Sequence, residues 1–219
     1  MSRMLIDLSD QARERVGPAL GACPALELRA GEAAIPAELS EAVLLVVERG
    51  VVLLASGARD AARRMIEAVA GPGAVLVPPT PGAELRALLR AQLTALTPDA
   101  ESALLREPDA AKAIMTALVA AVRDREESLA NLARFPHAER VRGKLLQLGR
   151  EHGKVSYDGV LIDLPLTHDL IAESVGSTRE TVTLALRELE QTGFLSRVDR
   201  RYRVNVSPEE LAARLPRSH

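Results

Sequence analysis

The pattern of apolar and polar positions between residues 25 and 98 predicts a β-rich segment. The stretch AVLLVVERGVVLLAS (42–56) contains two apolar runs, both with valine, and Glu48-Arg49-Gly50 separates them. Runs of this length and composition around a short polar break are typical of two strands and a turn. We therefore predict a hairpin over residues 42–56.

A second stretch of the same form follows at RMIEAVAGPGAVLVPP (64–79), where Gly71-Pro72-Gly73 supplies the turn signal. The next apolar segment, ELRALLRAQLTALTP (84–98), fits either a strand or a helix. Residues 1–24 are predicted to form a short helix followed by a loop. No aromatic residue precedes Phe135, so the core of this half must be aliphatic.

From Pro108 the pattern becomes helical. Proline suits the first position of a helix, and no further glycine or proline occurs before Pro136. The segment 108–134 is long enough for about seven turns. One stripe along it has the alternating spacing of three and four typical of a coiled-coil seam, and comprises Met115, Leu118, Val122, Arg125, Leu129 and Leu132. We predict a dimer interface here; the alternative is a helix that packs on its own domain.

The region after Pro136 predicts a small mixed domain. The segment FPHAERVRGKLLQLGREHG should be a helix that ends at Gly153. Asp158-Gly159 lies between the strand-like arms of KVSYDGVLIDLP (154–165), which is a hairpin signal. A second hairpin is predicted over GFLSRVDRRYRVNV (193–206), which is rich in arginine.

Between these two hairpins the pattern predicts a helix-turn-helix. LTHDLIAESVG is a short helix whose left-handed stop is Gly176. Ser177 then fits the N-cap of the next helix, and Ser177-Thr178-Arg179-Glu180 reads as a capping box. The second helix has an apolar stripe that comprises Val182, Ala185, Leu186 and Leu189.

The opposite side of that second helix offers groups for reading DNA. Glu180, Leu184 and Arg187 should point outward, with Thr183 at the edge of this face and Arg179 able to reach past the helix end. Arginine suits the two acceptors of guanine, and glutamate suits the amino group of cytosine. The alternative is that Glu180 only closes the capping box and Arg179 is only solvated.

The second hairpin favours DNA over that alternative. Its four arginines are Arg197, Arg200, Arg201 and Arg203. Unpaired arginines on a short hairpin beside a helix-turn-helix suit contacts to phosphates. His168, at the start of the first helix, should face a phosphate or solvent. We predict binding of double-stranded DNA by the C-terminal part of the chain.

Composition excludes several other classes. The net charge is −2, and residues 1–135 hold 15 basic and 18 acidic residues against 13 and 12 in residues 136–219. Nucleic-acid binding must therefore depend on local placement rather than bulk charge. Cys23 is the only cysteine and the four histidines lack a metal-pair spacing, so no metal site is expected. The start lacks a signal-peptide pattern and no run is long enough for a bilayer, so we expect a cytoplasmic protein without membrane contact.

The order of elements and the motif LTHDLIAESVGSTRETVTLALRELEQTGFL (166–195) resemble the family of the cyclic-AMP receptor protein and the fumarate–nitrate reduction regulator. The likeness is specific over 108–206 and rests on element order over 25–98. It implies an α+β fold with three parts. These are an N-terminal β jelly-roll domain like those that bind cyclic nucleotides (1–107), a dimerisation helix (108–135) and a winged helix-turn-helix (136–219).

The resemblance also implies roles for particular residues. Arg179 and Glu180 match the family's base-reading pair, and Thr167 and Thr178 match positions that contact phosphates. Leu184 departs from the pattern, because members that respond to cyclic AMP have a second base-reading arginine there. The predicted DNA-binding set is Thr167, Ser177, Thr178, Arg179, Glu180, Thr183, Leu184, Arg187, Arg200 and Arg201.

The predicted sensor half departs further from the family. The cassette that holds the cyclic phosphate is missing after residue 79, although Arg86 and Arg90 are present. Arg125 and Glu126 stand where the family's adenine-contacting hydroxyls would be. We therefore do not expect cyclic AMP to bind, and no other cofactor is predicted. Arg125 should pair with Asp124 or Glu126 of the partner helix or extend outward into solvent; the alternative is that it faces an anionic ligand.

These features together predict a homodimeric transcription regulator that binds a near-palindromic site, with RNA polymerase as a candidate partner. A first alternative is the same fold acting without a ligand. A second is an effector-binding protein whose helix-turn-helix contacts other proteins. A third, an enzyme of the jelly-roll type, would need metal-binding histidines, and residues 1–136 have none. The protein is therefore not expected to be an enzyme.

Overall fold

The computed structural model describes residues 18–19, 21–34, 39, 41–57 and 64–213. The chain divides into two compact units, residues 1–127 and 128–219. The division falls inside a single long helix, α4 (Pro108–Arg134). Most of the N-terminal segment 1–24, with its predicted short helix, lies outside the described residues.

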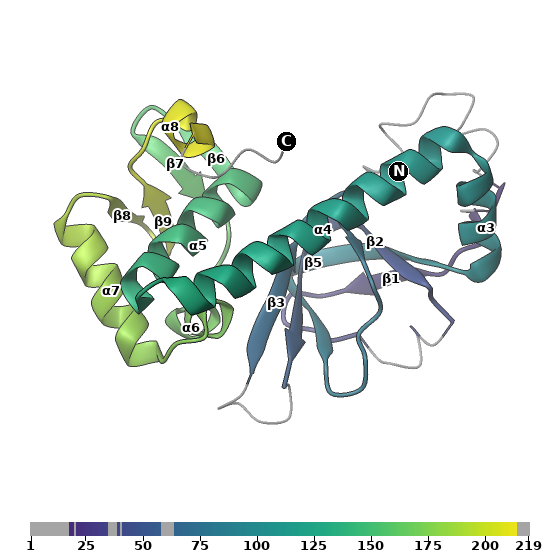
Figure 1. The fold of residues 1–219 in the computed structure, drawn as a ribbon, viewed down its shortest axis with the longest axis horizontal. Coiled ribbons are helices and arrows are strands. Elements are labelled where there is room, and N and C mark those ends of the chain that lie inside the picture. The colour runs from purple at the N-terminus through teal and green to yellow at the C-terminus, as the bar shows by residue number, and fades with distance from the viewer. Residues whose placement is uncertain (1–17, 20, 35–38, 40, 58–63, 214–219) are drawn as a thin grey trace. The chain divides into compact units, whose positions relative to one another are not determined.

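The N-terminal unit is built on an antiparallel sheet, in which two long central strands pair along most of their length (Figure 1). The order across the sheet is β1-β5-β2-β3, and the short β4 also pairs with β2. The strands are β1 (Ala25–Leu28), β2 (Leu44–Ser56), β3 (Met65–Ala70), β4 (Val75–Leu76) and β5 (Glu84–Leu96). Helix α3 (Pro98–Arg106) follows the sheet and leads into α4.

The predicted hairpin over residues 42–56 is wrong, because β2 is one continuous strand. Its pairing with β5 shifts register around Arg49. Gly50 lies there with φ 78°, and a Cβ at this position would be 2.0 Å from the carbonyl oxygen of Arg90. The polar break with its left-handed glycine therefore forms a β-bulge against β5 and does not reverse the chain.

The second predicted hairpin is correct only in its turn. The amide of Ala74 bonds to the carbonyl of Gly71, which closes the predicted turn. Its two arms, β3 and β4, do not pair with each other; both pair with β2, at opposite ends of that strand. The ambiguous segment 84–98 forms strand β5, which begins at Glu84 and ends at Leu96.

The N-terminal unit has an aliphatic cluster on each face of its sheet. One cluster contains Leu45, Val47 and Leu93; the other joins Leu44 and Val46 to α3 and α4 through Leu104 and Ile114. Residues of β2 belong to both clusters, so the strand is buried on both faces and is apolar at consecutive positions. A strand that is buried on both sides has no alternating pattern that could reveal its full length.

The C-terminal unit has the elements predicted for it. Both hairpins are present, and their strands join into one antiparallel sheet in the order β6-β7-β9-β8 (Figure 1). The elements are α5 (His137–His152), β6 (Gly153–Ser156), β7 (Gly159–Ile162), α6 (His168–Val175), α7 (Arg179–Gln191), β8 (Leu195–Val198), β9 (Arg201–Val204) and α8 (Pro208–Ala213). The predicted α+β class is confirmed.

Candidate nucleic-acid interface

The turn between α6 and α7 has the predicted left-handed glycine. Helix α6 begins after Thr167, whose side chain accepts a hydrogen bond from the amide of Leu170 at 3.1 Å. It ends at Gly176 with φ 56° and ψ 52°. The amide of Ser177 then donates to the carbonyl of Ala172 at 3.0 Å. Both ends of the short first helix are therefore satisfied, and α7 begins at a defined position.

The predicted N-cap of α7 is wrong by one residue. The cap is Thr178, which has an extended backbone and accepts from the amide of Thr181 at 3.2 Å. Ser177 still belongs to the turn, since its amide bonds back to α6, and its hydroxyl lies 2.8 Å from Nδ1 of His137. Glu180 is thus one position too early to close a capping box.

This shift bears on the role of Glu180. Its carboxylate is not needed to cap α7, and its side chain is exposed on the first turn of the helix. Arg179 is also exposed, at 65%, and its Nε lies 3.9 Å from an oxygen of Asp169, a weak contact across the turn. The structure therefore excludes the alternative in which Glu180 only closes the capping box. The side chains of Arg179 and Glu180 are both accessible to a ligand.

The two faces of α7 are as predicted. The inward stripe Val182, Ala185, Leu186 and Leu189 is buried. Leu184 is 65% exposed and Arg187 is exposed, while the hydroxyl of Thr183 donates to the carbonyl of Arg179 at 2.8 Å. The outward face near the start of α7 therefore presents an arginine, a glutamate, a threonine and a leucine.

Three of the four hairpin arginines have partners inside the unit, so the expectation of unpaired arginines is wrong for them. Arg197 donates to the hydroxyl of Tyr202 at 3.2 Å, and Arg203 pairs with Asp158 at 3.1 Å. Arg201 pairs with Asp163, which also pairs with Lys154. The sheet brings the acids of the first hairpin beside β9, which the sequence pattern could not indicate.

The exception is Arg200, which is exposed at the turn between β8 and β9 and has no ion pair among the described residues. The hydrogen bond from Lys154, together with the charge of Arg201, lowers the pKa of Asp163. This carboxylate stays ionised around neutrality and holds Arg201 in the sheet. Arg200 is thus the better candidate for a phosphate contact, and Arg201 is mainly structural.

His168 is neither solvated nor turned toward a phosphate. Its Nδ1 lies 2.8 Å from the hydroxyl of Thr183, and its Nε2 lies 3.1 Å from the hydroxyl of Tyr202. These partners are 15 and 34 residues away in the chain, so no local spacing could have predicted the contacts. His168 and the contact between His137 and Ser177 are the parts of the site that sequence reasoning missed.

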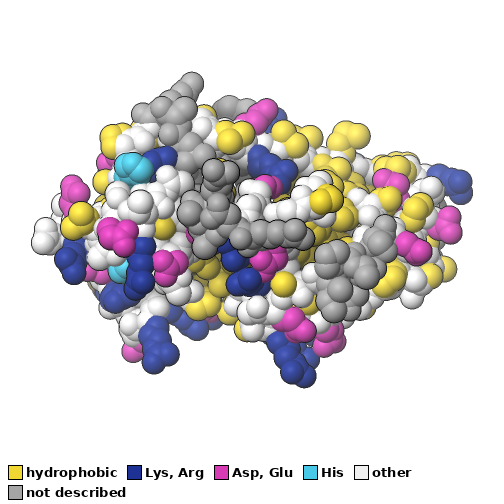
Figure 2. All heavy atoms as spheres, turned by 90° about the horizontal axis from the view of Figure 1, so that it is seen from below, with side chains coloured by type: hydrophobic (Ala, Val, Ile, Leu, Met, Phe, Trp, Pro, Cys, Tyr) yellow, Lys and Arg dark blue, Asp and Glu magenta, His cyan; other side chains and the backbone are white. Residues whose placement is uncertain are grey.

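The surface carries no single basic face in the view of Figure 2. Basic and acidic side chains alternate over it, in keeping with the near-neutral net charge (Figure 2). Among the described residues, no cluster of histidine, cysteine and acidic side chains could hold a metal ion. No helix in that part of the chain has the length and apolar character that crossing a membrane requires.

The geometry of α6, the glycine turn and α7 agrees with comparisons to known proteins. Residues 139–214 match the family described as the Crp-like helix-turn-helix domain. The C-terminal part of the chain therefore contains a Crp-like helix-turn-helix domain. The resemblance noted from the 166–195 motif is thereby confirmed.

Among curated proteins, this chain is similar to two that are named global nitrogen regulator. It is 35% identical to the Synechococcus elongatus protein over 96 residues, which cover 44% of this chain and 43% of that one. It is 36% identical to the Synechocystis protein over 104 residues, which cover 48% and 46%. The match thus spans less than half the length of these relatives.

Solved structures extend the likeness in fold to both units. A CooA mutant from Carboxydothermus hydrogenoformans has a TM-score of 0.72 at 19% identity, with 89% of this chain and 88% of that one covered. A cyclic nucleotide-binding domain containing protein from Listeria monocytogenes has a TM-score of 0.74 at 17% identity, with 90% and 97% covered. At this level of identity the comparison shows the fold alone.

The predicted seam on α4 is largely exposed in the part of the chain that the structure describes. Met115, Val122 and Leu129 are 66%, 55% and 61% exposed, while Leu118 packs partly against the cluster under α4. The side chain of Leu132 lies outside the described residues. Large aliphatic side chains spaced along one helix at this exposure form an apolar stripe that has no partner among the described residues.

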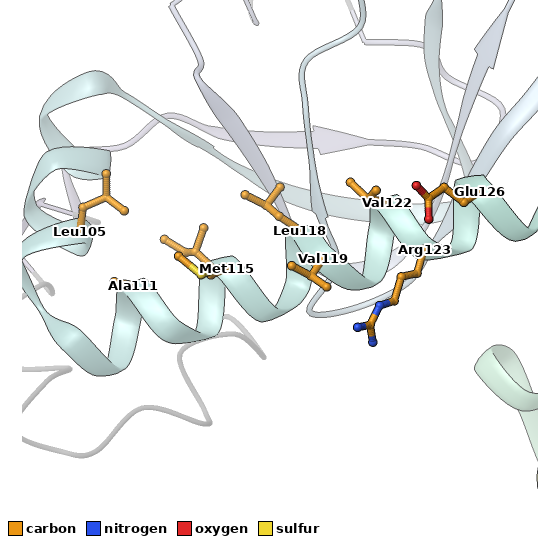
Figure 3. A pocket seen from close by; sticks show the side chains of 9 residues that line it. Leu105, Ala111, Met115, Leu118, Val119, Val122, Arg123 and Glu126 are labelled. Carbon is orange, nitrogen blue, oxygen red and sulfur yellow. The ribbon is translucent and has the colours of Figure 1, made fainter. Parts of the chain in front are cut away.

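Three residues of the stripe, Met115, Leu118 and Val122, line an apolar groove on α3 and α4 (Figure 3). Leu105 contributes from α3, and Met115, Val119 and Val122 contribute from α4. Figure 3 shows the guanidinium of Arg123 directed away from the apolar side chains. The groove has the composition expected of a surface that another apolar helix could cover.

Arg125 has a partner that neither of its predicted roles included. Its guanidinium pairs with Glu67 of β3, within the same chain. The partner-helix pairing and the anionic-ligand hypothesis both assumed a free cation, so the ion pair weakens both. Glu126 is exposed and lies at the end of the groove, with no contact to Arg125 among the described residues.

Proposed function

We propose that this protein is a homodimeric, sequence-specific DNA-binding transcription regulator. The observation that carries the proposal is the exposed first turn of α7, which presents Arg179 and Glu180 beside Leu184. A capped helix whose N-terminal side chains are free is the part of a helix-turn-helix that enters the major groove. The curated relatives that match this region are named as regulators, which supports the same assignment.

In the bound state Arg179 donates to a guanine and Glu180 accepts from a cytosine amino group. Thr167, Ser177, Thr178 and Arg200 lie at the turns around α6, α7 and the second hairpin, where backbone phosphates would pass. Arg187, farther along α7, offers a further phosphate contact. Leu184 contacts a thymine methyl in place of a charged reading group. The half-site is therefore related to those of Crp/Fnr proteins but differs opposite Leu184.

Cyclic AMP is not part of this proposal. The two arginines of β5 that could hold a cyclic phosphate have acidic partners: Arg86 pairs with Glu84, and Arg90 with Glu27 at 3.1 Å. Arg125 pairs with Glu67 in the same way. Regulation then depends on another effector, on a partner such as RNA polymerase, or on the amount of protein in the cytoplasm.

Selection from random duplexes tests DNA recognition directly. The purified chain is mixed with a pool of random DNA without added ligand, and the retained DNA is sequenced. We expect a near-palindrome whose half-sites lie about one turn of B-DNA apart. If nothing is enriched, the selection is repeated with cell extract to supply an effector. Continued absence of an enriched sequence would reject the proposal.

The dimer is tested on the exposed stripe of α4. We expect Val122→Glu to weaken self-association by about 10-fold or more, because a charge would be buried without a partner in the seam. Sedimentation velocity over a range of protein concentrations measures the change. Lys112→Glu is the matched control, since it adds an acid to an exposed position of α4 off the stripe. Equal association of both variants would place the interface elsewhere.

A further inference from the structure

A chain of hydrogen bonds runs from the second hairpin to the first turn of α7. Arg197 of β8 bonds to the hydroxyl of Tyr202 on β9, and that hydroxyl lies 3.1 Å from Nε2 of His168. Nδ1 of His168 lies 2.8 Å from the hydroxyl of Thr183, which bonds to the carbonyl of Arg179 at 2.8 Å. The chain thus connects β8, β9, α6 and α7 around one half-buried imidazole.

The direction of every bond in this chain follows from its two ends. A backbone carbonyl only accepts, so the single proton of the Thr183 hydroxyl goes to Arg179. Nδ1 of His168 must therefore donate to Thr183. In the neutral ring Nε2 then has no proton, so Tyr202 donates to it and accepts from Arg197. The geometry selects one tautomer, with the proton on Nδ1.

A second proton on His168 would break this order. Nε2 would then donate to Tyr202, whose own proton would lose its acceptor in a side chain that is only 1% exposed. The charged groups around the ring are Arg197 of β8, Arg179 and Glu190 of α7, and Asp169 of α6. Burial and then the two arginines outweigh the two acids and lower the pKa of His168.

We propose that His168 is a positioning residue for base readout, which holds the hydroxyl of Thr183 inward so that this residue offers only its methyl group to DNA. This inference rests on the proposed DNA-binding function. With its hydroxyl committed to His168 and Arg179, Thr183 cannot also bond to a base edge. Its methyl, next to exposed Leu184, forms an apolar pair suited to the methyl of thymine.

Two substitutions at Thr183 separate methyl from hydroxyl readout. Thr183→Val keeps the methyl group and removes the hydroxyl, whereas Thr183→Ser does the reverse. In random-duplex selection we expect Thr183→Val to retain the preference for a T·A pair opposite this residue. Thr183→Ser should reduce that preference by about fivefold or more. The opposite ranking would show that the hydroxyl reads the base, and would overturn the proposal.

The tautomer of His168 is measured on the protein without DNA, so the result of this test does not depend on DNA binding. Nitrogen-15 NMR of the imidazole should show His168 neutral at pH 7.5 with its proton on Nδ1. A proton on Nε2 or a charged ring would overturn the hydrogen-bond order and the inference with it. If this tautomer is found but no duplex is ever enriched, the proposed function fails while the structural chain stands.

The pH dependence of the T·A preference distinguishes a positioning role of His168 from a purely structural one. Because the pKa of His168 is lowered in the folded protein, the unfolded chain takes up the proton first as pH falls below about 6.5. Stability should then fall as the pH decreases from about 6.5 toward the folded pKa. The T·A preference should persist over that range, because the folded ring is still neutral there, and should be lost only as the pH falls through the folded pKa. His168→Gln should lack this dependence. An unchanged pH profile in the variant would remove His168 from the proposed role.

Discussion

Replacing Gly50 by alanine should destabilise the N-terminal unit by about 3 kcal/mol or more, among the larger effects of single substitutions. The backbone there has φ 78°, which alanine adopts only at a cost. A Cβ would also lie 2.0 Å from the carbonyl oxygen of Arg90, a backbone atom that cannot turn aside. The bulge between β2 and β5 would have to open, and the two longest strands of the sheet would lose their pairing.

Gly82→Ala is the matched control. Gly82 has φ 91°, and a Cβ there meets no atom within 4 Å. Gly82→Ala should destabilise the unit only by the cost of placing alanine in a left-handed backbone conformation, about 1 kcal/mol. Urea unfolding of both variants at one protein concentration measures the difference, which isolates the collision with β5. Equal destabilisation by the two variants would mean that β2 is not held against β5 at this bulge.

Arg179→Ala should remove most of the preference for one G·C pair in each half-site. A good bidentate contact between arginine and guanine discriminates by about 1–3 kcal/mol, which is roughly 5- to 150-fold. The side chain is 65% exposed and its contact with Asp169 is long, so its loss should leave the fold intact. Selection from random duplexes gives the base preference, and titration of the preferred duplex gives the affinity.

Arg200→Ala serves as the control for Arg179→Ala. Arg200 is exposed on the second hairpin, and a phosphate contact carries no sequence information. Its loss should weaken binding to all duplexes alike and reduce the slope of log affinity against log salt by about 1. The base preference should not change. If Arg179→Ala behaved in the same way, Arg179 would be a phosphate contact rather than a reading residue.

The C-terminal unit was predicted closely because its signals are local. Gly176 can adopt the left-handed conformation that ends α6, and the stripe from Val182 to Leu189 repeats at helical spacing. Each of these signals lies within a few residues of the structure that it specifies. The error at the N-cap was also local, since Ser177 and Thr178 are adjacent hydroxyl residues that can both cap a helix. The turn geometry after Gly176 decides between them.

The N-terminal sheet was predicted less well because its pairing is not local. Glu48-Arg49-Gly50 has the composition of a turn, yet β2 continues through it, since β5 lies alongside and the glycine accommodates the close approach. Turn and bulge use the same left-handed glycine. Only the presence of a neighbouring strand distinguishes them, and that strand is some forty residues away in the chain.

The sequence by itself determined the helix-turn-helix, the two hairpins around it, and the exposure of Glu180, Leu184 and Arg187, because period and capping chemistry act over one or two turns. Tertiary structure alone decided which charges remain free. It paired Arg201 with Asp163 and Arg125 with Glu67, and it placed His168 between Thr183 and Tyr202. Such contacts join residues distant in the chain, and their energy depends on distance and burial, which no local pattern contains.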